Sequence, residues 1–236
     1  MKNFIFYCCV LLVLPGLSFG QKYSLGVVAK TGISQVIYSS DIQESSSFDV
    51  SNKYRFAYAG GIFGQLRISP RSAFGIEVLY RRQNGLYIVN SDVTDTFTLT
   101  HVISTTKNYT YVDYIGVPVN YLYYIGSITL HVGAQANFAI SQKGKVIYDA
   151  TVNGALVHDE YTTDTLNFEK IDAGLSAGIH YNITPFFYVG IDYYLGFANL
   201  IPDTGLNVGA QNQNIAASFG FRLLPVVKKP QEFYTH

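Results

Sequence analysis

The feature that most constrains this chain is a two-residue alternation of apolar with small or polar side chains, repeated along most of its length. Between residues 170 and 183, for example, Ile171 and Leu175 alternate with Asp172 and Ser176. Successive side chains of a β-strand point to opposite faces, so this pattern predicts strands with one apolar and one polar face. Helical periodicity is scarce, and the predicted fold class is therefore all-β.

The alternation occurs in eight segments whose connections are short and long in turn. The short connections contain turn-forming residues such as Pro70 and Gly126, whereas the long ones are polar. Short turns at one end and long links at the other are typical of an antiparallel up-and-down barrel whose ends meet different compartments. The predicted strands are 22–33, 53–68, 73–88, 109–124, 128–141, 170–183, 186–198 and 214–224, and the long links are 34–52, 89–108, 142–169 and 199–213.

The polar face of these strands carries too little charge to be the outer surface of a soluble barrel. Asp, Glu, Lys and Arg make up 14% of the chain, against roughly 25% in soluble domains. The polar face is rich in Gly, Ala and Ser instead, which suit the crowded lumen of an eight-stranded barrel. The apolar face is bulky, with aromatics such as Tyr54 and Phe187 near strand ends, as in the girdles at membrane interfaces.

The facing of the strands therefore predicts an eight-stranded antiparallel up-and-down transmembrane β-barrel, with its apolar face toward lipid. The short turns are expected to be periplasmic, and the long loops and hairpins extracellular. A closed barrel is the β architecture that satisfies its backbone hydrogen bonds in lipid. The alternative is a soluble lipocalin-like barrel, which would turn its apolar face inward onto a ligand.

The N-terminus is typical of a secretory signal peptide. Lys2 precedes an apolar run at 4–14, and the small residues Ser18 and Gly20 stand before an expected cleavage site at Gln21. Both cysteines of the chain lie inside this segment, so the mature protein is expected to contain no disulfide. The expected organisation is a signal peptide at 1–20, an outer-membrane barrel at 21–224 and a short periplasmic tail at 225–236.

Three segments of the mature chain resemble the outer-membrane β-barrels of Bacteroidota, the PorT-like group of OmpA-like eight-stranded barrels. Residues 114–121 (YIGVPVNY) are similar to that family's aromatic-x-x-Ile/Val-Pro-hydrophobic strand. Residues 188–200 are similar to its Tyr-x-x-Gly strand and Asn-hydrophobic exit, and residues 218–223 to its closing Gly-aromatic-Arg segment. The resemblance implies an outer-membrane location and a barrel without an assigned activity. PorT, one member of this group, is implicated in type IX protein secretion, so the resemblance makes a part in that process an alternative expectation for this chain.

Little in the sequence indicates catalysis, a cofactor or a nucleic acid. The 16 basic residues balance the 16 acidic ones, which leaves no basic surface for nucleic acid. Ser176 and His180 share a strand face but are spaced too far along it to touch, and no nucleophile elbow occurs. No phosphate loop or His/Cys metal cluster is apparent. We expect a non-enzymatic protein without cofactor or metal; a lipid-modifying outer-membrane enzyme is the alternative.

The same facing places a set of polar and charged side chains in the lumen. Because buried charges need partners, the set is predicted to form a structural network of ion pairs and hydrogen bonds that fills the barrel. The alternative is a basic interior that attracts anions. The predicted members are Lys30, Arg55, Arg67, Glu77, Arg81, Asn120, His131, Gln135, Asp172, His180, Asp192 and Arg222.

Two predictions concern the outer end. Arg82 and Asp113 are the charges expected on the lipid-side face of strands, nearly opposite each other, and are predicted to pair at the outer rim near lipid or lipopolysaccharide head groups. Two links are predicted to continue as hairpins, at 86–103 and, around Asn153-Gly154, at 145–161. We expect a structural role or a protein partner at these hairpins.

Overall fold

A computed structural model describes residues 23–40, 48–95, 100–164, 166, 168–201 and 208–224. The predicted signal peptide and C-terminal tail lie outside these residues. The described residues form β1 (Tyr23–Ser40), β2 (Phe48–Ser69), β3 (Ser72–Asp95), β4 (Thr100–Ile125), β5 (Ile128–Val152), β6 (Ala155–Thr163), β7 (Ile171–Asn182), β8 (Phe187–Gly196) and β9 (Val208–Leu224).

Eight of these strands form a closed ring of antiparallel pairs. Strands β1 to β5 pair in sequence order, and β5 then pairs with β7, β7 with β8, and β8 with β9. The ring closes where β1 pairs with β9, from Leu25 opposite Leu224 to Ser40 opposite Val208. The all-β, eight-stranded, up-and-down barrel predicted from the alternation is therefore confirmed, and β6 is an additional strand outside the ring.

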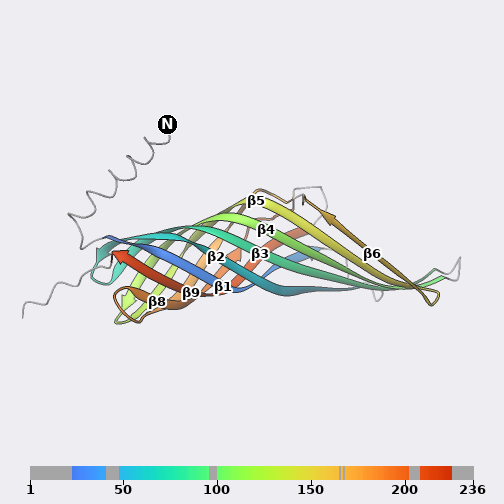
Figure 1. Ribbon diagram of the computed structural model, residues 1–236, viewed down its shortest axis with the longest axis horizontal. Helices are drawn as coiled ribbons and strands as arrows, with labels where there is room; N and C mark the ends of the chain where they lie inside the picture. Colours follow the sequence, from blue (N-terminus) through green and yellow to red (C-terminus); the bar gives the residue numbers. More distant parts are fainter. Residues whose placement is uncertain are drawn as a thin grey trace, which may run out of the picture.

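The strands extend further at one end of the barrel than at the other, as Figure 1 shows. At the short-turn end, β2 joins β3 across 70–71 and β4 joins β5 across 126–127. At the long-loop end, β3, β4, β5 and β6 run on beyond the other strands (Figure 1). There β3 pairs with β4 up to Asp95 opposite Thr100.

Strand β5 changes its partner along its length. From Ile128 to Phe138 it pairs with β7, and from Gly144 to Val152 it pairs with β6. The turn between β5 and β6 is the predicted Asn-Gly turn, in which Asn153 and Gly154 have φ of 46° and 86°. Positive φ at both central residues is the requirement of a type I′ hairpin turn, which explains why Asn-Gly stands here.

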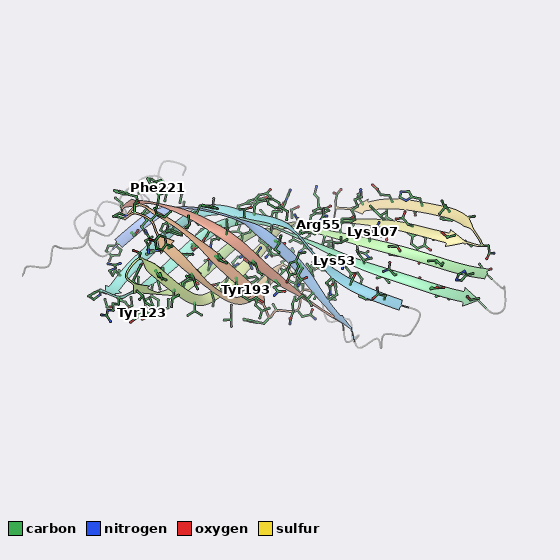
Figure 2. The ribbon with its side chains drawn as sticks, turned by 90° about the horizontal axis from the view of Figure 1, so that it is seen from below. Lys53, Arg55, Lys107, Tyr123, Tyr193 and Phe221 are labelled. Carbon is green, nitrogen blue, oxygen red and sulfur yellow. The ribbon has the colours of Figure 1, made fainter. Side chains whose placement is uncertain are left out.

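The apolar face of the barrel points outward. Ile62 and Ile191 are 56% and 63% exposed, and Phe74 and Phe219 are exposed likewise. Figure 2 shows side chains, including the labelled Tyr123, Tyr193 and Phe221, around the outside of the barrel. The inward positions are buried and largely polar, with Asp172 at 0% exposure. The described residues contain no helix long and apolar enough to cross a membrane.

Glycines on the inner face make room for large side chains of neighbouring strands. A Cβ atom at Gly220 would collide with the ring of Tyr188, and one at Gly116 would lie 2.7 Å from Arg81 Cδ and 2.8 Å from Asn137 Oδ1. The small residues that the sequence places on the polar face are therefore spacers between bulky lumen side chains.

A Gly220→Leu substitution tests this packing. The added side chain has no room beside Tyr188, and overpacking typically costs about 1–3 kcal/mol. Gly60→Leu is the matched control, because the nearest atom to a Cβ there is 3.8 Å away. We expect a lower fraction of folded barrel for Gly220→Leu, measured by gel mobility in SDS before and after boiling. Equal folded fractions for the two variants would contradict this packing.

Candidate functional site

At the centre of the lumen, three nitrogen-bearing side chains from different strands surround one carboxylate. Asp192 Oδ1, on β8, lies 2.9 Å from His131 Nε2, 3.3 Å from His180 Nε2 and 3.5 Å from Lys30 Nζ. Lys30 Nζ also lies 2.9 Å from Glu77 Oε2. Strands β1, β3, β5, β7 and β8 thus each bring one side chain to this cluster.

Aromatic rings pack under this cluster on the side of the short-turn end. The ring of Tyr188 stacks on His180 with centroids 4.6 Å apart, and Phe63 meets Tyr188 edge-on at 5.8 Å. His131 and His180 lie 4.6 Å apart, ring to ring. Tyr188 and Phe63 are each 2% exposed, so two large rings fill the lumen at this level.

A second cluster, nearer the long-loop end, is centred on Asn137 and Asp172. Asn137 Oδ1 accepts hydrogen bonds from Arg81 Nη1 at 3.3 Å and Gln135 Nε2 at 2.6 Å. Asp172 Oδ2 accepts from Asn137 Nδ2 at 3.1 Å and from Asn212 Nδ2 at 2.9 Å. Both central residues are 0% exposed. The carboxylate is therefore held by amide donors of other strands.

The remaining lumen residues lie nearer the turns or between the clusters. Arg222 Nη2 donates to Asn182 Oδ1 at 2.7 Å, and its guanidinium lies 5.0 Å from the Tyr188 ring centroid. Arg67 stacks on the ring of Tyr124 at 4.5 Å. Asn120 of β4 and Ser176 of β7 are both buried.

The structure corrects the position of Arg55. This residue is exposed, and its guanidinium carbon lies 5.3 Å from the ring centroid of Tyr109. Figure 2 shows Arg55 near Lys107, where the barrel gives way to the long hairpins. The pairing of β2 with β3 shifts register between Tyr54 and Tyr58, which breaks the regular alternation from which a buried lumen position was predicted.

Sequence reasoning missed several members of the lumen network. Asn137, Tyr194, Asn212 and Tyr114 are buried, and Asn212 Nδ2 also lies 3.1 Å from Tyr114 Oη. Asn137 and Asn212 continue the alternation of polar side chains in their strands toward the long-loop end. This continuation is the sequence signal that could have identified them as lumen residues. Asn212 lies just outside the predicted last strand, which was placed at 214–224, because β9 extends to Val208.

An apolar cluster lies at the long-loop end of the lumen. Val36 of β1, Ala210 of β9 and Leu200 are 4%, 0% and 0% exposed, and Phe168 and Tyr38 pack against them. The cluster reaches across the mouth. A Cβ at Gly85 of β3 would lie 3.0 Å from Val36 Cγ2, and Tyr38 Oη lies 3.3 Å from Thr110 Oγ1 of β4.

On the outer face, Arg82 and Asp113 stand directly opposite each other in the pairing of β3 with β4. Arg82 Nε lies 2.6 Å from Asp113 Oδ1, and Arg82 Nη2 lies 2.7 Å from Asp113 Oδ2. This two-point geometry fixes both side chains, because a planar guanidinium matches a carboxylate fork.

The hairpins beyond the barrel are tied by cross-strand polar pairs. Lys145 Nζ lies 2.8 Å from Glu160 Oε1, and His158 Nδ1 lies 2.7 Å from Asp149 Oδ1. On the other hairpin, His101 Nε2 lies 2.7 Å from Asp92 Oδ1. His158 beside Asp149 holds the pKa of that carboxyl below its usual value, with a smaller contribution from Lys107.

Strand β6 is the most exposed element of the hairpins. Its residues Ala155 to Thr162 are exposed on both faces, and Leu156 is 88% exposed. In the described part of the chain, β6 pairs with β5 alone. The neighbouring Val157 and Tyr161 are also exposed, at 45% and 56%. The hairpins therefore present apolar side chains and a sheet edge rather than a cavity.

Ser176 and His180, the serine and histidine that share a face of β7, do not contact each other. Ser176 Oγ donates to Asn120 Oδ1 at 2.7 Å, while His180 Nε2 faces Asp192. A serine nucleophile would have to lie within hydrogen-bond reach of its base. These two residues have separate partners, so the shared strand face does not amount to a catalytic pair.

Comparisons with known proteins agree with this architecture. Residues 19–202 match the family described as "Outer membrane protein beta-barrel domain". The chain belongs to this family. No curated protein sequence matches it.

Solved structures of outer-membrane proteins are similar to this outer-membrane β-barrel protein at low identity. Ail, the attachment invasion locus protein of Yersinia pestis, is 11% identical, with 85% of this chain and 99% of that chain covered and a TM-score of 0.32. Neisserial surface protein A is 14% identical, with coverages of 83% and 96% and a TM-score of 0.35. OprG of Pseudomonas aeruginosa is 9% identical, with coverages of 86% and 98% and a TM-score of 0.36.

A double-mutant cycle tests the Arg82–Asp113 pair of this barrel. Arg82→Ala, Asp113→Ala and the double variant are unfolded in urea from lipid vesicles, and their free energies of unfolding are compared. Because the pair has two-point geometry at a partly exposed site, we expect a coupling energy of roughly 0.5–1 kcal/mol. Strictly additive losses would show that the two side chains do not support each other.

A carboxyl titration tests the His158–Asp149 pair. Because the folded pKa of Asp149 is depressed, the pair stabilises the hairpin above the unfolded pKa, and this support is lost as pH falls through the folded pKa. We expect His158→Gln to raise the pKa of Asp149 toward 3.8, measured by NMR of the carboxyl carbon. His101→Gln, on the other hairpin, is the control and should leave Asp149 unchanged. An unaltered Asp149 titration in His158→Gln would contradict the pairing.

Proposed function

We propose that this outer-membrane barrel has no catalytic activity and binds a protein partner through its hairpins, with the long-loop end facing the cell exterior. The observation that supports this most is β6, an exposed strand whose pairing within the described residues is to β5 alone. A strand edge of this kind accepts a further strand by main-chain hydrogen bonds, while neighbouring side chains give specificity. Leu156 and Tyr161 supply apolar contacts beside that edge.

The arrangement of the rest of the molecule supports the same assignment. The lumen is filled by buried polar side chains, with the apolar cluster around Leu200 at its long-loop end, so it offers little room to a substrate. The hairpins have their own ion pairs, which order them without a partner. An interface that is ordered before binding loses less conformational entropy on association. Outer-membrane lipid or lipopolysaccharide is the expected surrounding of the apolar belt and of the Arg82–Asp113 pair.

Site-specific photo-crosslinking in cells tests the proposal. A photoreactive amino acid replaces Leu156 on β6, and the control position is Ile191, which is 63% exposed on the barrel wall. We expect discrete protein adducts from position 156 and none of the same mass from position 191. Deletion of residues 145–161 should abolish the adducts but leave the barrel folded, because β5 pairs with β7 outside that segment. Identical adducts from both positions, or none from position 156, would refute partner binding at β6.

The resemblance of residues 114–121 and 188–200 to PorT-like barrels gives a second candidate, a component of type IX secretion. A deletion strain tests it directly. Loss of cargo secretion that is restored by the intact chain would support this role, and normal secretion would exclude it. Unchanged lipid A in the same strain would exclude the lipid-modifying alternative.

A further inference from the structure

Three groups able to ligate a transition metal converge in the lumen. The ligand atoms of His131, His180 and Asp192 all lie within 4.8 Å of one another, and all three residues are buried. Asp192 Oδ1 is 2.9 Å and 3.3 Å from the two Nε2 atoms. Tetrahedral zinc with bonds of about 2.0–2.1 Å separates its ligand atoms by about 3.3 Å. The two separations from Asp192 Oδ1 lie within about 0.4 Å of this value, and all three ligand atoms stay within 4.8 Å of one another.

The hydrogen bonding of His131 gives an independent observation. Its side chain is 2% exposed, and among the described residues its Nδ1 has no hydrogen-bond partner. Its Nε2 lies 2.9 Å from Asp192 Oδ1, so this nitrogen faces the carboxylate directly. Asp192 Oδ2 also lacks a partner within the described part of the chain. Buried polar atoms are nearly always paired, so these atoms call for a further partner, such as a water molecule or an ion.

The charge balance around the cluster points the same way. The two buried clusters of the lumen hold three carboxylates, Glu77, Asp172 and Asp192, against two cations, Lys30 and Arg81. Arg67 and Arg222 stack on the rings of Tyr124 and Tyr188, nearer the short-turn end. A buried negative charge without compensation is costly. Taken alone, the two clusters can accept one more positive charge, a proton on an imidazole or a bound cation, while the buried Arg222 adds a further cation beside Tyr188.

We propose that His131, His180 and Asp192 bind one zinc ion inside the barrel. Two imidazoles and one carboxylate suit zinc and related transition metals, whereas calcium and magnesium prefer oxygen ligands throughout. Gly178 and Gly190 leave room for the two imidazoles. A Cβ at Gly178 would collide with His131, and one at Gly190 would collide with His180. Tyr188 and Phe63 fill the lumen on the short-turn side of the site, and the apolar cluster of Val36, Leu200 and Ala210 lies toward the long-loop end, so we expect the ion to enter while the barrel folds.

Substitution of Lys30 distinguishes a zinc site from a network of protein side chains alone. Its ammonium lies 3.5 Å from Asp192 Oδ1, where it repels a neighbouring cation and competes for that oxygen. A Lys30→Met variant is therefore expected to bind zinc about tenfold more tightly or better, since each factor of ten corresponds to about 1.4 kcal/mol. In a network of protein groups alone, removal of Lys30 creates no affinity for zinc.

The experiment refolds the full mature chain into detergent micelles with and without zinc, removes unbound metal, and counts zinc per chain by mass spectrometry. We expect one zinc per chain, with at least about 100-fold weaker binding for His131→Gln and Asp192→Asn, since even outer-shell changes at metal sites cost 10–100-fold. The matched control is the double variant His101→Gln/His158→Gln, which removes the two exposed His–Asp pairs of the hairpins. It should keep its zinc.

A second measurement covers the case in which a lumen variant fails to fold. Cobalt refolded into the unaltered chain should show the intense visible absorption of a tetrahedral nitrogen and oxygen site. Absence of stoichiometric zinc, loss of zinc in the hairpin variant, or an octahedral cobalt spectrum would each overturn the proposal. Imidazole protonation in place of metal would appear as zinc-free folding with a histidine NMR titration.

Discussion

The constraint on which the structure depends is that every peptide group in the lipid-facing wall must be hydrogen-bonded within the protein. An open sheet would leave two edges without partners. Here β1 pairs with β9 along its length, from Leu25 to Ser40, and this seam removes both edges of the wall. The even number of strands in the ring follows from antiparallel closure of neighbours. The exposed apolar faces, the buried polar lumen and the unequal ends all follow from that closure.

Closure with eight strands leaves a lumen just wide enough for side chains. Several large polar residues therefore lie against glycines: Arg81 and Asn137 lie against Gly116, and His180 against Gly190. Within this space, which charged residues meet depends on how their strands are arranged around the barrel, and not on their separation in the sequence. Asp192 of β8 meets residues of β1, β5 and β7, and Asp172 of β7 meets residues of β5 and β9. The same crowding that fills the barrel brings potential metal ligands into contact.

The alternation of side chains was sufficient to predict the strand class, the number of strands in the ring and the outward apolar face. It also predicted two hairpins, and Asn153-Gly154 identified the turn of one of them. Alternation alone does not determine register, and the contacts of His131, His180 and Asp192 depend on register across two separate strand pairs. The irregular pairing near Arg55 and the change of partner by β5 also depend on which strands pair and in which register. The alternation of side chains does not contain that information.

The apolar cluster of Val36, Leu200 and Ala210 has a consequence for the membrane that holds the barrel. Ions cross a pore through a continuous water path, and fully buried apolar side chains offer no surface for water to line. At this level of the barrel the three residues therefore narrow the space that such a path would need.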